Sequence, residues 1–122
     1  LRMKVSGNED GMLIFKIVPR VEWESAGDFY AGSAHDQADG FLHFSTGPQL
    51  AETLRLYYAG QNDLVLAAVD PAKVAADLKW ERSPSRGEDF PHLFSTLPRA
   101  AVTWAKPLVR GADGTFTLPD LT

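Results

Sequence analysis

The sequence predicts an α+β fold in which two main helices pack on a mostly antiparallel, strongly bent β-sheet. Short apolar runs bounded by Pro, Gly, Asp or Ser recur along the chain, as in strands joined by turns. Only two longer segments carry helix signals. The triplet Ala112-Asp113-Gly114 predicts a hairpin near the C-terminus. Runs of strands with few helices between them are typical of α+β domains.

The apolar runs define the expected strands. The run at 64–69 is the most hydrophobic and is expected at the centre of the sheet. The other expected strands and extended segments are 12–18, 41–45, 78–81, 91–97, 101–109 and 115–118.

Two segments carry the signals that begin and end helices. A short helix is predicted over 20–26, after Pro19 and before the capping Gly27. A second begins at Thr46, where Gln49 completes a capping box, and continues to Gly60. Residues 70–76 predict one or two further helical turns. The stretches 28–40 and 83–89 are expected to be loops, and a loop as long as the first is usually functional or mobile.

Composition limits the classes of function. The 122 residues suit a single domain, expected over 12–122 after a flexible lead-in over 1–11. A net charge of −4 without a basic cluster argues against a nucleic-acid partner. The absence of cysteine excludes disulfides, thiolate catalysis and cysteine-ligated metals. No apolar run is long enough to span a membrane and the start has no signal-peptide pattern, so a cytoplasmic location is expected, and no feature sets the oligomeric state.

The segment Gly40–Thr46 is the leading candidate for a functional site. If Leu42 and Phe44 face the core of a strand, then His43 and Ser45 lie together on its other face. An imidazole and a hydroxyl in one cleft can bind sugar hydroxyls or phosphate oxygens. The alternative is a structural His43, hydrogen-bonded within an ordinary fold.

Two further residues are candidates for chemistry. Glu81 follows Trp80 at a strand end, where a carboxylate beside an aromatic wall can orient a ribose or stabilise an oxocarbenium-like centre. His92 follows Pro91 and a polar loop. The alternatives are a solvent-exposed Glu81 and a His92 that anchors its loop through backbone carbonyl groups.

Several common site types are not expected. The sequence contains no glycine-rich phosphate loop and no nucleophile elbow. The histidines lack the spacing of metal ligands, so no metal site is predicted, although one built from His35, Asp36, His43 and His92 is conceivable.

Taken together, the motifs resemble those of DUF952, a family of short bacterial proteins of unknown function, from about Leu13 to Phe116. The matching motifs are Ile14–Ile17, Trp23, Gly27, Tyr30, Asp39–Thr46, Gln49, Asp63–Leu66, Trp80–Glu81, Phe90–Leu93 and Ala101–Val102. That family is similar in fold to the ADP-ribosyltransferases, which use NAD⁺. The resemblance implies a bent, split sheet with a ligand cleft between its halves.

The resemblance also implies roles for particular residues. Lys16 occupies the first-strand position that holds the ribose, Ser45 lies in the second motif, and Glu81 is the candidate for the third. Tyr30, Thr46 and His92 complete the expected ligand-binding set with His43. The chain departs from the family at Lys16, where histidine is usual, and after His92, where Leu93-Phe94-Ser95 replaces the usual Tyr-Gly pair.

Two hypotheses follow. The favoured one is a non-catalytic domain that binds a nucleotide-like or sugar-like ligand, or a protein partner, around Gly40–Thr46, because lysine at position 16 adds a charge and cannot accept a hydrogen bond. The alternative is an enzyme that transfers ADP-ribose or hydrolyses NAD⁺, with Glu81 and His43 as catalytic residues. Only the enzyme hypothesis calls for a cofactor, which would be NAD⁺.

Overall fold

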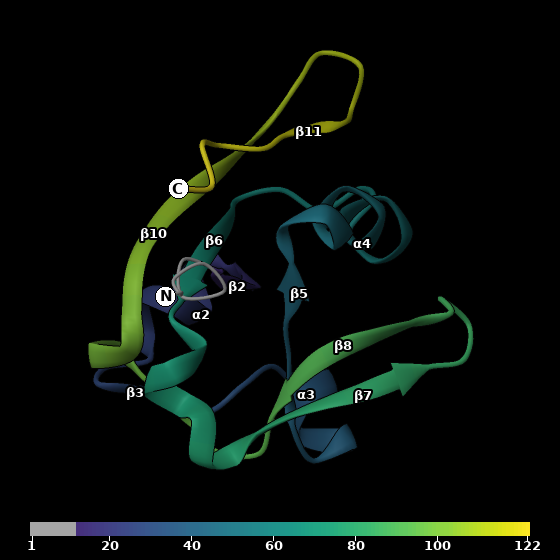
Figure 1. Ribbon diagram of the computed structural model, residues 1–122. Coiled ribbons are helices and arrows are strands. Elements are labelled where there is room, and N and C mark those ends of the chain that lie inside the picture. Colours follow the sequence, from purple (N-terminus) through teal and green to yellow (C-terminus); the bar gives the residue numbers. More distant parts are fainter. Residues whose placement is uncertain (1–11) are drawn as a thin grey trace.

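The computed structural model describes residues 12–122 and contains three sheets in which every strand pairing is antiparallel. The lead-in expected over residues 1–11 lies outside the described residues. Figure 1 shows the long, curved β10 on one side of the molecule and the β7–β8 hairpin on the other. The predicted α+β class with a bent antiparallel sheet is confirmed.

The strands divide among the three sheets as follows. The five-stranded sheet has the order β11 (Phe116–Thr117), β10 (Val102–Arg110), β6 (Leu64–Val69), β2 (Ile14–Pro19) and β5 (Ser45–Thr46). The three-stranded sheet has the order β4 (Leu42–His43), β8 (Glu88–Leu93) and β7 (Leu78–Ser83), and the two-stranded sheet pairs β3 (Phe29–Tyr30) with β9 (Leu97–Pro98).

The core lies on both faces of β6, the strand predicted to be central. This strand pairs with β10 on one side and β2 on the other, and all of its residues are buried. Because side chains alternate along a strand, one set of its residues packs into each of two hydrophobic clusters. Val65, Ala67 and Val69 belong to the first cluster, and Leu64, Leu66 and Ala68 to the second.

The segment Gly40–Thr46 is divided between two sheets. Leu42 and His43 pair with β8, whereas Ser45 and Thr46 pair with β2. At the division, the Phe44 amide donates to the carbonyl oxygen of Pro91 at 3.0 Å. The single strand expected over 41–45 is therefore wrong in detail, because the chain leaves one sheet at His43 and enters another at Ser45.

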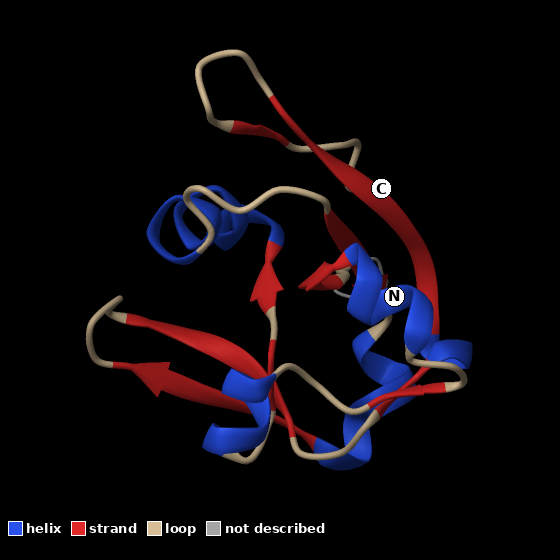
Figure 2. Ribbon diagram, turned by 180° about the vertical axis from the view of Figure 1, so that it is seen from behind, coloured by secondary structure: helices blue, strands red, loops and turns tan. Residues whose placement is uncertain are grey.

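The helices are short and begin at recognisable caps. They are α2 (Arg20–Ser25), α3 (Ala34–Asp39) and α4 (Leu50–Tyr57), with 3₁₀ helices at Gly47–Gln49, Pro71–Asp77 and Arg99–Ala101. Figure 2 shows them in blue around the red strands. The capping box predicted at Thr46 is confirmed, since its amide donates to the Gln49 side chain at 2.9 Å. No helix within residues 12–122 combines the length and apolar character needed to cross a membrane.

The loop predicted over 28–40 is wrong, because it contains both β3 and α3. Helix α3 begins with a capping box in which the Asp36 amide donates to Ser33 Oγ at 3.1 Å and the Ser33 amide donates to Asp36 Oδ2 at 2.9 Å. It ends at Gly40, whose φ is +88°. Likewise, β7 and β8 extend into the loop expected over 83–89 and leave a turn at 84–87. A six-residue helix is too short to show an apolar period.

Gly32 sets the entry into α3 and yields a testable prediction. Its φ is +101°, and a Cβ atom there would lie 2.8 Å from the Cβ atom of Asp36. Gly32→Ala should lower the free energy of unfolding by about 2 kcal/mol or more, because a clash adds to the usual penalty for positive φ.

Gly60→Ala is the matched control. Gly60 also has a positive φ, of +84°, but a Cβ atom there meets nothing within 4 Å. Gly60→Ala should lower the free energy of unfolding by only about 1 kcal/mol, which is the backbone penalty alone. Equal losses for the two variants in chemical denaturation would contradict the close approach of Gly32 to Asp36.

Candidate functional site

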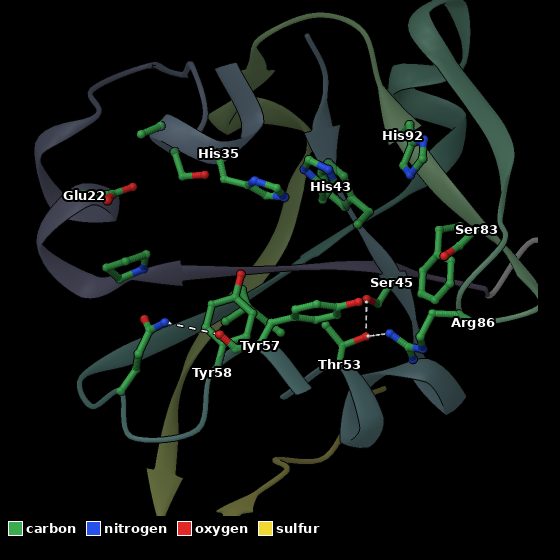
Figure 3. Close-up of a pocket in the computed structure, with 17 residues that line it drawn as sticks. Glu22, His35, His43, Ser45, Thr53, Tyr57, Tyr58, Ser83, Arg86 and His92 are labelled. Carbon is green, nitrogen blue, oxygen red and sulfur yellow. Dashed lines mark hydrogen bonds between the residues drawn. The ribbon is translucent and has the colours of Figure 1, made fainter. Parts of the chain in front are cut away.

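A pocket of about 790 Å³ is lined by residues of β2, α2, α3 and α4, of β4 and β5, and of the hairpin formed by β7 and β8. Figure 3 shows three histidines along one rim, with tyrosines, hydroxyls and an arginine facing them. The ionisable and hydroxyl-bearing lining residues outside the tyrosines include Glu22, His35, His43, Ser45, Thr53, Arg86 and His92. The pocket therefore draws these side chains from α2, α3, β4, β5, α4, β8 and the turn after β7.

Asp36 lies behind the histidine rim and joins three elements. Its side chain is 2% exposed. Oδ1 accepts from the His43 amide at 3.1 Å and contacts His43 Nδ1 at 2.6 Å. Lys16 Nζ donates to Oδ1 at 3.2 Å and lies 2.9 Å from Oδ2, which accepts from the Ser33 amide. A buried carboxylate needs such a set of donors, because burial without them is costly.

These donors decide the charge state of Asp36. Burial alone would raise its pKa, but the hydrogen bond with His43, the charge of Lys16 and the Ser33 amide together hold the pKa well below its usual range. Asp36 is thus an ionised, fully partnered carboxylate at the base of the site.

Lys16 is the buried counter-ion of Asp36. It lies on β2 between Ile14 and Val18, both part of the first hydrophobic cluster, and is 3% exposed. Burial lowers the pKa of the Lys16 ammonium, and the charge and hydrogen bond of Asp36, together with Glu22, offset that effect only in part. Lys16 does not line the pocket. The ion pair with Asp36 therefore connects β2 of the five-stranded sheet to α3.

His43 is held through both ring nitrogens. Nδ1 contacts the buried Asp36, and Nε2 lies 2.9 Å from Oδ2 of Asp39. The ring of His35 stacks on that of His43, with their centroids 4.6 Å apart. Side-chain contacts thus fix the orientation of the His43 ring at the rim of the pocket.

His92 forms a second histidine–carboxylate pair. Its Nδ1 lies 2.7 Å from Oε1 of Glu81 on the neighbouring strand, so it is not anchored through backbone carbonyl groups. The Phe41 ring stacks on His92 with a centroid distance of 4.0 Å and also contacts His43. The two histidine rings are 5.6 Å apart. Both rings line the pocket, each oriented by a carboxylate behind it.

The opposite wall consists of hydroxyls, an arginine and aromatic rings. Ser45 Oγ and Thr53 Oγ1 are 3.3 Å apart, and Arg86 donates to Thr53 Oγ1 at 3.1 Å. The Arg86 guanidinium also lies over the Phe90 ring. Burial, with the charges of Asp36 and Glu22, raises the pKa of Tyr58 to about 12, so its hydroxyl stays neutral at physiological pH.

The structure brings some of the predicted site residues together and separates others. His43, Ser45 and His92 line one pocket. Tyr30, Thr46, Glu81 and Lys16 do not. The Tyr30 hydroxyl donates to Glu22 at 3.1 Å, and burial, with the charges of Glu22 and Asp36, raises its pKa. Thr46 caps the helix that follows it, and Glu81 reaches the pocket only through His92.

Sequence reasoning missed part of the pocket. Asp39 lies on α3, in the stretch predicted to be a loop, and its approach to His43 was not predicted. His35, named above only in a conceivable metal site, lies on the same helix. The signal that could have found this helix is Ser33-x-x-Asp36 followed by Gly40, a capping box with a glycine end. Arg86 and Thr53 are 33 residues apart in the sequence, and no local pattern connects them.

The Lys16–Asp36 pair yields a stability prediction. Asp36→Asn should lower the free energy of unfolding at pH 7 by about 3–5 kcal/mol, because Lys16 then keeps a buried charge without its counter-charge. Asp39→Asn, which removes an exposed carboxylate four residues from His43, should cost less than about 1 kcal/mol. Urea denaturation measures both variants.

The loss of stability in Asp36→Asn should depend on pH. Because folding lowers the pKa of Asp36, its stabilising contribution is complete above about pH 4 and is lost as the pH falls through the folded-state pKa. The stabilities of the wild type and Asp36→Asn should therefore converge below about pH 4. A difference that stays constant from pH 7 to acid would show that Asp36 is not the ionised partner of Lys16.

Comparison with known proteins gives a family and a fold. The model of a family described as "Protein of unknown function (DUF952)" matches residues 17–105. The crystal structure of protein CC0527 from Caulobacter crescentus is 44% identical, with a TM-score of 0.81 over 87% of this chain and 94% of that one. The solution structure of CC0527 is 45% identical, with a TM-score of 0.75 over 84% and 90% of the two chains. No curated protein matches.

Proposed function

Since this chain belongs to the DUF952 family, whose function is unknown, a function has to be inferred from the residues of its pocket. We propose that this pocket binds a phosphorylated, nucleotide-like or sugar-like small molecule. One observation carries the proposal. A single pocket of about 790 Å³ combines an arginine, oriented histidines and hydroxyls with aromatic rings. Small-molecule sites are concave and largely apolar, with a few convergent polar groups.

Arg86 and its neighbours form the phosphate-binding end of the proposed site. Within residues 12–122, Arg86 takes part in no ion pair, and its guanidinium donates to Thr53 Oγ1 and to the carbonyl oxygen of Gln49. Its charge is therefore available to an anion. Because a guanidinium matches the geometry of phosphate oxygens, Arg86 with the hydroxyls of Thr53 and Ser45 suits a phosphate group.

The aromatic residues offer the surface for a base or a sugar ring. Tyr57, Tyr58 and Phe90 line the pocket, and the Tyr57 side chain is exposed. Bases and sugars stack on such rings with little sequence preference. Across the pocket, the His43 ring forms part of the wall, and His92, whose Nδ1 contacts Glu81, can present Nε2 to a ligand hydroxyl.

A ligand titration tests the binding proposal. Addition of ADP-ribose at about 100 times its Kd should stabilise the fold by about 2.7 kcal/mol, measured as a shift in melting temperature. Arg86→Ala should weaken binding about tenfold or more, because a charge-assisted hydrogen bond contributes about 1.5–3 kcal/mol.

Arg82→Ala is the matched control for this titration. Arg82 lies on the same hairpin, is 66% exposed and pairs with Asp89 outside the pocket. Its removal should leave the affinity unchanged. If ADP-ribose, NAD⁺, AMP and ribose 5-phosphate all fail to shift the melting temperature, or if the two arginine variants behave alike, the proposal fails.

An NAD⁺-dependent enzyme is the second candidate function. It is favoured by the Glu81–His92 pair, because Glu81 orients a histidine that lines the pocket and can carry a proton to or from a bound ligand. In this hypothesis Glu81 positions His92, and His43 contacts the ribose of NAD⁺.

Nicotinamide release from NAD⁺ tests this second candidate. Glu81→Gln should reduce the rate by about 100-fold or more, the size of a typical acid–base contribution, whereas Asp89→Asn on the same hairpin should not. A pH–rate profile separates loss of a proton-transfer group from loss of stability. Release that persists undiminished in Glu81→Gln would remove Glu81 from the mechanism, and no release by the wild type would leave the binding function alone.

A further inference from the structure

Three side chains at the rim of the pocket converge on one point. His35 and Asp39 lie on α3 one turn apart, and His43 follows on β4. Asp39 Oδ2 lies 2.9 Å from His43 Nε2 and 3.6 Å from His35 Nε2. One ligand atom from each residue lies within 4.8 Å of the other two. Figure 3 shows the His35 and His43 rings side by side.

The hydrogen bonds of His43 make this convergence informative. Asp36 fixes the proton of a neutral imidazole on Nδ1, through the contact of 2.6 Å. The lone pair of Nε2 would then face the Asp39 carboxylate at 2.9 Å, which places two acceptors together. A positive charge between them removes the conflict. A metal ion bound by both atoms would supply that charge.

We propose that His35, Asp39 and His43 bind a divalent transition-metal ion, with Zn²⁺ the best match. Two imidazoles and one carboxylate form a recognised zinc ligand set. Asp36 behind His43 supplies the carboxylate–histidine–metal arrangement that fixes the ligand's tautomer and raises its basicity. The inference goes beyond the proposed ligand and does not depend on it.

The geometry is close to that of a metal site. In a tetrahedral zinc site with bonds of about 2.0–2.1 Å, ligand atoms lie about 3.3 Å apart. Two of the three separations, 2.9 and 3.6 Å, bracket that value, and all three lie within 4.8 Å. His35 would turn out of its stack on His43, a movement that its 75% exposed side chain permits. Because His35 and His43 also line the pocket, the remaining coordination position would be within reach of a water or a ligand oxygen there.

Metal titration of the full chain tests the site. After treatment with a chelator, the protein should bind one equivalent of Zn²⁺ by calorimetry, and Co²⁺ should give the visible absorption of a four-coordinate site. His35→Ala and Asp39→Asn should each weaken the Zn²⁺ affinity by at least about tenfold, since even outer partners of metal ligands have effects of that size. The melting temperatures of the metal-free variants should stay near that of the wild type, because both residues are exposed.

Asp28→Asn is the matched control, because it removes one exposed carboxylate outside the cluster. It should bind Zn²⁺ as the wild type does. The proposal is overturned if the wild type binds no Zn²⁺, or if the double variant His35→Ala/Asp39→Asn binds as tightly as the wild type. Neither result bears on ligand binding at Arg86, so failure here is distinguishable from failure of the proposed function.

Discussion

The contact on which the site depends is the one between the buried Asp36 carboxylate and its donors. Lys16 reaches it from the five-stranded sheet, Ser33 from the start of α3, and His43 from the three-stranded sheet. An unpartnered buried charge would cost several kcal/mol, so these elements can pack only in an arrangement that delivers every donor. The ion pair therefore specifies position more than it adds stability, since a buried ion pair repays little beyond its own desolvation.

This constraint explains why the segment Gly40–Thr46 is split. Asp36 accepts from both the amide and the ring of His43, and these contacts hold His43 against α3 and in the three-stranded sheet. Two residues later, Ser45 pairs with Phe15 in the five-stranded sheet. The chain must pass from one sheet to the other across Phe44, and the pocket is lined by residues of both sheets. The same few residues thus join the sheets and line the pocket.

The sequence predicts best what depends on neighbouring residues. The central strand over 64–69, the capping box at Thr46 and the C-terminal hairpin follow from apolar runs and turn chemistry, and all are present. The site is harder to predict, because it depends on contacts between residues far apart in the chain. Lys16 and Asp36 are 20 residues apart, and Arg86 and Thr53 are 33 apart. The periodicity of the sequence does not predict such pairs. The short helix that carries Asp36 is recognisable in the sequence only by its capping box.

The balance of charge around Asp36 determines what the pocket offers to a ligand. Lys16 is paired with Asp36 inside the protein and does not line the pocket, so Arg86 is the arginine or lysine among the residues that line it. His43 already satisfies Asp36 through Nδ1, and Asp39 faces its other nitrogen as a second carboxylate. Asp36 is matched by Lys16, whereas Asp39 pairs, within residues 12–122, with His35 and His43 alone. The metal ion proposed at that rim would be held by Asp39 and the two histidines and would not use Arg86, whose charge would stay available to a phosphate group.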